Sequence, residues 1–227
     1  MPRSTSATWA ARRARLLSAA LLVALAACQG TRNLMDPILE IQTPGGQELG
    51  VSTDYGVLFL GRTARSGEVS VIAWFGDGPS LELSVVEPLG EGLYTAETQI
   101  RLPVVPITFR TPRPGDRVRI SGRRGRDSWE AEARVLSDPR VEGLLLAIPD
   151  ELEDAGDQVG AAVFVNDPDT GRRKLVALVS GKLELTGEDG ATARYLTAMG
   201  PEQIWRLVTR RQDLLQRRRW IYREDVL

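Results

Sequence analysis

The side chains that most often carry out catalysis are nearly absent from this sequence. Its 227 residues include no histidine and one cysteine, Cys28. A chain without histidine has no Ser-His-Asp triad, no Cys-His dyad, no imidazole metal site and no histidine-based pH switch. A single cysteine excludes an intrachain disulfide and a cysteine-rich zinc site. The chemistry left to the chain is that of carboxylates, guanidinium groups, hydroxyls and one thiol.

Carboxylates gather in one acidic run, Asp150-Glu151-Leu152-Glu153-Asp154-Ala155-Gly156-Asp157. Such oxygen ligands suit Ca²⁺, and a pair of carboxylates can hydrolyse a glycosidic bond. The run lacks the spacing of an EF-hand loop, and no acidic pair stands out by its spacing. Because charge runs are usually exposed, we expect a solvated loop here, with no metal site and no cofactor. A histidine-free carboxylate hydrolase stays a low-ranking alternative.

Arginines form a second cluster, on an expected strand and turn that contains Arg123, Arg124 and Arg126. Sites for single-stranded nucleic acid usually interleave basic residues with aromatic ones, and here only Trp129 is near. The formal net charge of the chain is −1, so we expect no nucleic-acid partner. The three arginines remain candidate contacts for a protein or peptide partner.

The N-terminus has the pattern of an export signal. Its first 15 residues contain four arginines and no acid, and an apolar run follows from Leu16 to Ala27. That run is shorter than the ~20 residues that span a bilayer, so it is typical of a secretory signal peptide. It ends in Leu25-Ala26-Ala27-Cys28, which resembles the lipobox of bacterial lipoproteins.

The lipobox resemblance implies a lipid anchor. Residues 1–27 would be removed, and Cys28 would be acylated, with palmitate among its acyl chains, as the first residue of the mature protein. Each buried CH₂ is worth ~0.8 kcal/mol, so several acyl chains hold a protein firmly on a membrane. Gln29 follows the cysteine, which in lipoproteins of this kind favours the outer membrane over the inner one. We therefore expect a lipid-anchored protein of the bacterial cell envelope.

Residues 28–50 are rich in proline, glycine and polar residues, and we expect them to form a flexible tether. From residue 51 to residue 200, short alternating runs separated by turn residues predict strand after strand, which is typical of a β-sandwich or β-barrels. The expected strands are Tyr55–Arg62, Glu68–Phe75, Leu81–Glu87, Leu93–Leu102, Asp116–Gly122, Ser128–Leu136, Val141–Ile148, Val159–Asn166, Lys174–Ser180, Lys182–Thr186 and Ala193–Ala198.

One amphipathic helix and tail are expected over residues 201–227. Pro201 suits the first turn of a helix, and apolar residues then recur at helical spacing. We expect this helix to pack its apolar stripe on the body, with Trp205 buried there. In the alternative, its basic end binds a membrane surface or a partner, and Trp220 projects as a contact residue.

Four segments, in the right order, resemble trypsin-like serine peptidases. Gly156-Asp157-Gln158-Val159-Gly160-Ala161-Ala162-Val163-Phe164 is similar to their nucleophile segment, Gly-Asp-Ser-Gly-Gly/Ser-Pro-Val-Phe. The strand that follows it in the family usually ends Val-Val-Ser-Gly, and Lys174–Gly181 resembles it. Pro114–Gly122 is similar to the start of the family's second barrel. Ala193–Ala198, followed by a helix, is similar to the last strand and the terminal helix.

The resemblance implies an all-β body of two small antiparallel barrels with a C-terminal helix. The first barrel half would span residues 51–103 and the second residues 104–200. It also implies an inactive member, because Gln158 or Val159 stands where the family has its nucleophile and no histidine is available as the base. This segment is one residue longer than the family's, so we expect no intact oxyanion hole around Gly160.

Two functions of different classes follow, and they predict different surfaces. The first is a noncatalytic envelope lipoprotein that binds a protein or peptide partner in a retained peptidase groove. The second is a structural or assembly lipoprotein whose β body has no such groove. An open, apolar groove next to Gln158 distinguishes the first from the second. The sequence indicates no oligomeric state.

Overall fold

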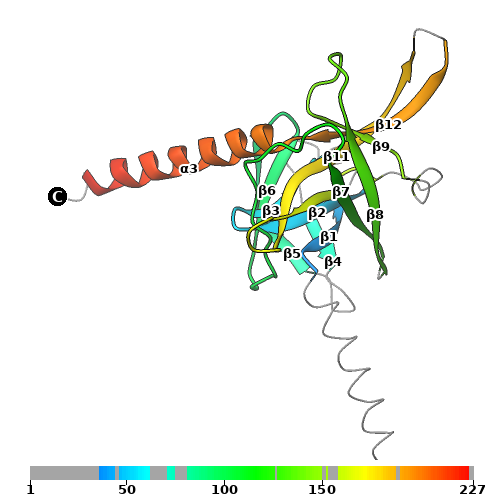
Figure 1. Cartoon of the computed structure of the whole chain (residues 1–227). Coiled ribbons are helices and arrows are strands. Elements are labelled where there is room, and N and C mark those ends of the chain that lie inside the picture. The colour runs from blue at the N-terminus through cyan, green and yellow to red at the C-terminus, as the bar shows by residue number, and fades with distance from the viewer. Residues whose placement is uncertain are drawn as a thin grey trace, which may run out of the picture. The chain divides into compact units, whose positions relative to one another are not determined.

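A computed structural model describes residues 36–43, 46–61, 71–74, 81–125, 127–149, 152, 158–187 and 190–224. The chain divides into an N-terminal unit, Met1–Asp36, and a body, Pro37–Leu227. All the elements in Figure 1 that carry labels belong to the body. The expected signal peptide and the expected lipidation site, Cys28, lie outside the described residues.

The first half of the body is a closed antiparallel barrel. Its strands follow the order β1-β2-β3-β6-β5-β4, and pairing between β1 and β4 closes the ring. Buried apolar side chains, among them Leu39, Val57 and Phe59, fill its centre. The strands are β1 (Ile38–Thr43), β2 (Gly46–Thr53), β3 (Gly56–Phe59), β4 (Val71–Trp74), β5 (Leu81–Gly90) and β6 (Leu93–Thr98).

The second half is another closed barrel of the same kind. Its order is β10-β11-β12-β9-β8-β7, and β7 pairs with β10 to close it. Its core includes Ile120, Leu146 and Val176. The expected all-β body of two barrels is confirmed. The strands are β7 (Arg117–Arg124), β8 (Asp127–Leu136), β9 (Leu144–Ala147), β10 (Ala162–Asn166), β11 (Arg173–Thr186) and β12 (Thr192–Met199).

The expected tether over residues 28–50 is wrong from residue 38 onward. Residues 38–43 and 46–50 belong to β1 and β2, which pair antiparallel from Ile38↔Val51 to Thr43↔Gly46. The first barrel therefore begins at residue 38 rather than 51. Ile38, Leu39 and Ile41 are fully buried, and without β1 the barrel would not close. Proline and glycine residues over this stretch indicated a flexible linker, but Gly46 begins β2 and pairs with Thr43.

The expected break at Ser180-Gly181 is also wrong, because β11 is one continuous strand. Its register against β12 shifts between Val179 and Gly181, which marks a β-bulge. A glycine inside a strand often marks a bulge rather than an end. The result is a long β11–β12 hairpin whose outer part projects beyond the barrel (Figure 1).

The turn between β10 and β11 is organised by Asp167. Its carboxylate pairs with Lys174 and accepts hydrogen bonds from the backbone N–H groups of Asp169 (3.1 Å) and Thr170 (2.8 Å), and from the Thr170 hydroxyl (2.9 Å). The hydrogen bond from Lys174 and those from Thr170 hold the pKa of Asp167 well below its usual range. All of these contacts stabilise the ionised form of the carboxyl group.

We expect Asp167→Asn to lower the melting temperature of the protein at pH 7. Because folding lowers the pKa of Asp167, its contribution to stability is present above the pKa of the unfolded chain, about 3.9. The contribution is lost as the pH falls toward the folded-state value. Melting curves of both proteins between pH 7 and pH 3 should therefore converge in acid. Asp169→Asn, in the same turn, should show no such convergence, because Asp169 contributes its backbone N–H to this network and its side chain forms none of these bonds.

One helix, α3 (Pro201–Glu224), ends the described chain. The Gln203 side chain accepts a hydrogen bond from the Gly200 N–H (3.1 Å), which caps the first turn. Ile204, Leu207 and Val208 are buried in a core cluster that both barrels share. Trp205 packs, as predicted, with its ring edge-to-face against Tyr55 and Phe109.

Beyond its first three turns the helix leaves the barrels (Figure 1). Arg211 interrupts the apolar stripe because it pairs with Glu87 (2.7 Å) and Glu97 (3.5 Å). Leu214 and Leu215, further along the stripe, are exposed. The side chain of Trp220 lies outside what the structure describes, so its predicted role as a contact remains a prediction. Among the described residues, no helix has the length and apolar character needed to span a membrane.

Candidate functional site at the seam of the barrels

The two barrels are held together by the segment that links them and by a common core. The Val105 N–H donates to Ser52 O of the first barrel (3.0 Å), and the Thr108 N–H donates to Leu175 O of the second (2.9 Å). The shared core contains Val51 and Leu58 from one barrel with Phe164 and Leu178 from the other. The seam is therefore a packed interface.

The segment that resembles a peptidase nucleophile loop lies at this seam. Gln158, Val159 and Gly160 are buried and lead through a turn into β10, so the strand begins at Ala162 rather than at Val159 as predicted. Strand β2 of the first barrel contacts the segment directly, because the Leu49 N–H donates to Val159 O (3.2 Å). The Leu49 side chain packs in the core cluster of the second barrel. Gly156 and Asp157, the first residues of the motif, lie outside the described residues.

The backbone N–H groups after Gln158 are used within the protein. Gly160 N–H donates to Val179 O (2.8 Å), and Ala161 N–H donates to Gln158 O (2.9 Å). An oxyanion hole needs backbone donors that point at the oxygen of a substrate. These two N–H groups bond within the protein instead. The family's oxyanion donors are the N–H of the nucleophile and that of the residue two before it, which correspond here to positions 156–159. Gly156 and Asp157 lie outside the described residues, so the expectation about the oxyanion hole stays a prediction.

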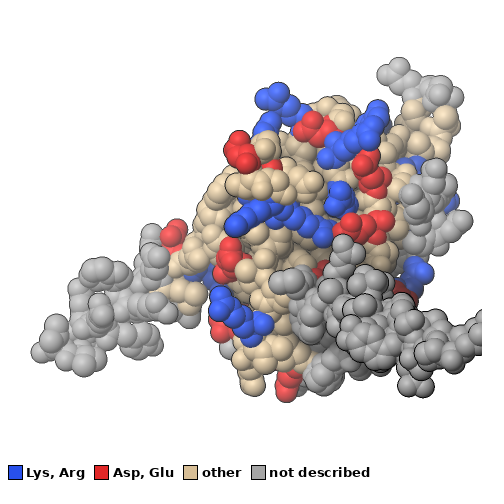
Figure 2. Space-filling view, turned by 60° about the horizontal axis from the view of Figure 1, so that its bottom comes forward, with Lys and Arg blue, Asp and Glu red and all other residues tan. Residues whose placement is uncertain are grey.

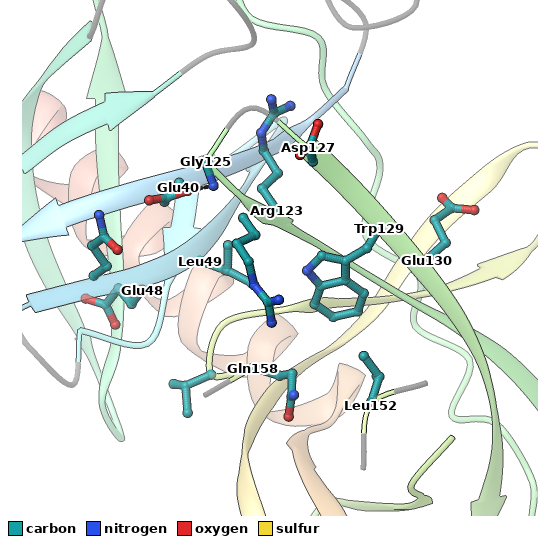
Figure 3. Close-up of a pocket in the computed structure, with 13 residues that line it drawn as sticks. Glu40, Glu48, Leu49, Arg123, Gly125, Asp127, Trp129, Glu130, Leu152 and Gln158 are labelled. Carbon is teal, nitrogen blue, oxygen red and sulfur yellow. Dashed lines mark hydrogen bonds between the residues drawn. The ribbon is translucent and has the colours of Figure 1, made fainter. Parts of the chain in front are cut away.

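A cleft of about 510 Å³ opens beside Gln158 (Figure 3). Strands β1 and β2 of the first barrel form one wall, and the hairpin of β7 and β8 forms the other. The full lining is Glu40, Gln47, Glu48, Leu49, Arg123, Arg124, Gly125, Asp127, Trp129, Glu130, Leu152, Gln158 and Val159. An open, apolar groove next to Gln158 was the feature that would distinguish a binding module from a spacer. A cleft is present there, but its lining is mixed rather than apolar. Most of its lining side chains are polar or charged, because the alternating faces of β7 and β8 turn arginines and acids toward it.

Three charged side chains of the cleft are almost fully buried. Glu40 and Glu48 come from the first barrel and Arg123 from the second, and each is no more than 8% exposed. Figure 3 shows the Arg123 guanidinium pointing into the cleft, between the Trp129 indole and Gln158. Glu40 accepts a hydrogen bond from the Gly125 N–H (2.6 Å), which fastens the turn of the β7–β8 hairpin to β1. Such bonds offset the cost of burying charge.

Comparisons with known proteins identify the fold. No protein-family model matches the sequence, and no curated protein matches it. Among solved structures, the serine protease of a human pathogenic astrovirus matches with a TM-score of 0.52 over 74% of this chain and 91% of that chain. The body has the trypsin-like fold. The two sequences are 14% identical, so the likeness is one of fold.

Within this trypsin-like fold, the predicted contact residues are only partly brought together. Arg123 and Arg124 both line the cleft, Arg123 buried and Arg124 exposed. Arg126 lies outside the described residues. Leu152 of the acidic run also lines the cleft. In the described part of the chain, no group of three or more metal-ligating side chains occurs.

Sequence reasoning missed Glu40, Glu48 and Trp129 as cleft residues. Glu40 and Glu48 fall within residues 28–50, which the sequence assigned to a flexible tether, so nothing indicated that they belong to a barrel wall. For Trp129 a signal was available, because it lies directly opposite Gly122 in the β7–β8 ladder. A Cβ at Gly122 would lie 2.3 Å from the indole. A glycine inside a strand often marks such a close approach.

Charges of both signs are interspersed on the surface. Figure 2 shows Lys and Arg side chains next to Asp and Glu over the face it presents. On β7 and β8, Arg117 pairs with Glu132 (2.9 Å), and Arg119 pairs with Glu130 (3.8 Å). Arg173 of β11 also pairs with Glu130 (2.7 Å) and lies over the Phe164 ring. Exposed pairs of this kind contribute little to stability, about 0–1 kcal/mol each.

Proposed function

We propose that the chain is a noncatalytic protein of the trypsin-like fold, anchored in the bacterial cell envelope through lipidated Cys28, that binds an extended peptide segment of a partner protein. The observation that carries this proposal is the edge of β11 that projects beyond the second barrel, from Leu183 to Thr186 (Figure 1). An edge open to another strand favours a peptide-binding module over a β-barrel spacer.

The residues of the nucleophile-like segment support a noncatalytic protein. Gln158 has a carboxamide, which is no nucleophile, and Val159 has no reactive group. The chain has no histidine to act as a base. Removing triad members costs several orders of magnitude in rate and leaves only what binding and an oxyanion hole supply. Because the segment is one residue longer than the family's, we expect no intact oxyanion hole and hence no such remainder.

Peptide binding is supported by a strand edge that starts beside Gly160. One edge of β11 faces β10. Pairing along this edge, with β10 and with the segment before it, runs as far as Val179, whose N–H donates to Ala161 O (2.9 Å). The opposite edge pairs with β12 as far as Thr186. Among the strands that the structure describes, none pairs with the β10-facing edge from Leu183 to Thr186. Since closed barrels have no free edges, this projecting stretch is where a peptide can add as a strand.

The partner site is tested with a photoreactive amino acid placed in the full-length, membrane-bound protein. We expect a residue introduced at Leu183 to crosslink one defined partner, and the same residue at Arg172, in a different hairpin, to crosslink none. Replacing residues 184–194 by a two-residue Asn-Gly turn keeps the Leu183↔Tyr195 pair and the barrel pairings of β11 and β12, and it should abolish that crosslink. If Leu183 and Arg172 give the same pattern, the spacer hypothesis is favoured.

The anchor is tested separately. We expect Cys28→Ser to move the protein from the membrane pellet to the soluble fraction and to abolish incorporation of labelled palmitate. Loss of the acyl chains removes about 0.8 kcal/mol of membrane affinity per CH₂. A Cys28→Ser protein that stays in the pellet after a salt wash would contradict lipid anchoring at this residue.

A further inference from the structure

Several polar side chains in the cleft form no bonds within the protein. Arg124 and Asp127 at the two ends of the β7–β8 turn are both exposed and lie opposite each other in the ladder. Within the described part of the chain, neither side chain makes a hydrogen bond or an ion pair, and the same holds for Gln47 on β2 and for the indole N–H of Trp129. These groups offer three kinds of donor (guanidinium, amide and indole N–H) and two kinds of acceptor (carboxylate and amide oxygen) to a ligand.

The signs of the charges argue against a strongly charged ligand. The lining contains four acids, Glu40, Glu48, Asp127 and Glu130, and two arginines. Glu130 is paired with Arg173 outside the cleft, so the remaining charges nearly balance. An anion would face the buried Glu40 and Glu48, and a cation would face the buried Arg123. A hydroxyl group fits both kinds of wall, because it donates to a carboxylate and accepts from a guanidinium.

Trp129 adds a flat apolar surface to this polar lining. Gly122, opposite it in the ladder, leaves room for the indole to lie close to β7. Figure 3 shows the ring forming part of the cleft wall next to Arg123. An indole has an apolar face and one N–H donor at its edge. A pyranose ring has the matching chemistry, with an apolar C–H face surrounded by hydroxyl groups.

We propose that the cleft binds a neutral saccharide of two or three rings, with one ring on Trp129 and its hydroxyls on Asp127, Arg124 and Gln47. The cavity of about 510 Å³ lies within the range of small-molecule sites, roughly 300–1,000 Å³. None of its lining residues comes from β11. The saccharide site therefore goes beyond the proposed peptide edge, and each can fail without the other.

The test is a calorimetric titration of the purified protein with three neutral probes, namely maltotriose, cellotriose and chitotriose. We expect at least one of them to bind, and Asp127→Asn and Trp129→Ala each to weaken it at least tenfold. Asp127 is exposed, so its variant should fold normally even if the loss of Trp129 disturbs the barrel. Trp205→Phe, which alters an indole outside the cleft, should leave the affinity unchanged.

Two outcomes would overturn the saccharide proposal. One is that none of the three probes binds while a peptide crosslinks at the cleft, which would make the cleft a peptide site. The other is that a probe binds equally well to wild type, Asp127→Asn and Trp129→Ala. The ligand could be part of an envelope polymer or a free sugar, and a pelleting assay with an insoluble envelope polysaccharide distinguishes the two. Co-sedimentation that Asp127→Asn abolishes indicates the polymer, whereas binding of the trisaccharide alone indicates a free sugar.

Discussion

Gly160→Ala should destabilise the protein by about 3–5 kcal/mol, lowering its melting temperature by roughly 10 °C or more. Gly160 has a φ of 82°, in the region that residues with a Cβ rarely adopt. A Cβ at this position would lie 2.0 Å from the backbone oxygen of Leu49. Because that oxygen belongs to β2 of the first barrel, the clash can be relieved only by moving the two barrels apart at the seam.

Gly171→Ala is the matched control for this prediction. Gly171 also has a positive φ, 64°, but no atom lies within 4 Å of the Cβ it would gain. Gly171→Ala should therefore lose only the stability that a Cβ costs at a positive φ, about 1–2 kcal/mol. Thermal and urea unfolding of both variants measures the difference. If the two variants lose the same stability, the close contact between Gly160 and Leu49 does not hold the seam together.

Gln158→Ser should restore no peptidase activity. The substitution puts a hydroxyl at one of the two positions where the family resemblance expects the nucleophile. A serine hydroxyl needs a neighbouring base, and the chain has no histidine. In working triads, losing the serine or the histidine costs about 10⁶-fold in rate. We therefore expect both wild type and Gln158→Ser to leave peptides uncut and to remain unlabelled by a fluorophosphonate, which marks activated serines.

Val159→Ser is the companion variant, because the longer segment allows a second alignment of the nucleophile position. It should be equally inert. Labelling of either variant at a rate well above that of free serine would show that another group acts as the base. Substitutions at the cleft carboxylates Glu40 and Glu48 would then be the next experiment. The hypothesis of a carboxylate hydrolase would return with that result.

The second barrel was predictable from the sequence, and the start of the first was not. In the second barrel, alternation such as Trp129-Glu130-Ala131-Glu132-Ala133 matches the observed burial of β8, where alternate residues are exposed. Residues 38–50 differ because Pro44, Gly45 and Gly46 interrupt two short strands. Only closure of the ring, through pairing of β1 with β4, requires a strand there, and closure is a long-range property that no local pattern reports.

The candidate site was predictable in position but not in composition. The resemblance around Gln158 implied a segment of a two-barrel fold that leads into a strand, and in the structure this segment lies at the seam of the barrels and leads into β10. The polar lining depends on β1, on β2 and on the β7–β8 turn, and Glu40 of β1 lies 85 residues before its partner Gly125. Glu40, Glu48 and Arg123 meet only because the barrels pack together. No spacing in the sequence relates these residues.

The most direct test of the central claim, that this trypsin-like body binds peptides without cutting them, is one incubation of the purified protein with a diverse peptide library. Mass spectrometry then reads which peptides are retained and whether any is shortened. We predict a retained set of intact peptides that is lost when residues 184–194 are replaced by the Asn-Gly turn. Peptides that appear shortened, with cleavage lost in Gln158→Ala, would contradict the claim. A library recovered intact with nothing retained would contradict it too, and would favour a structural spacer.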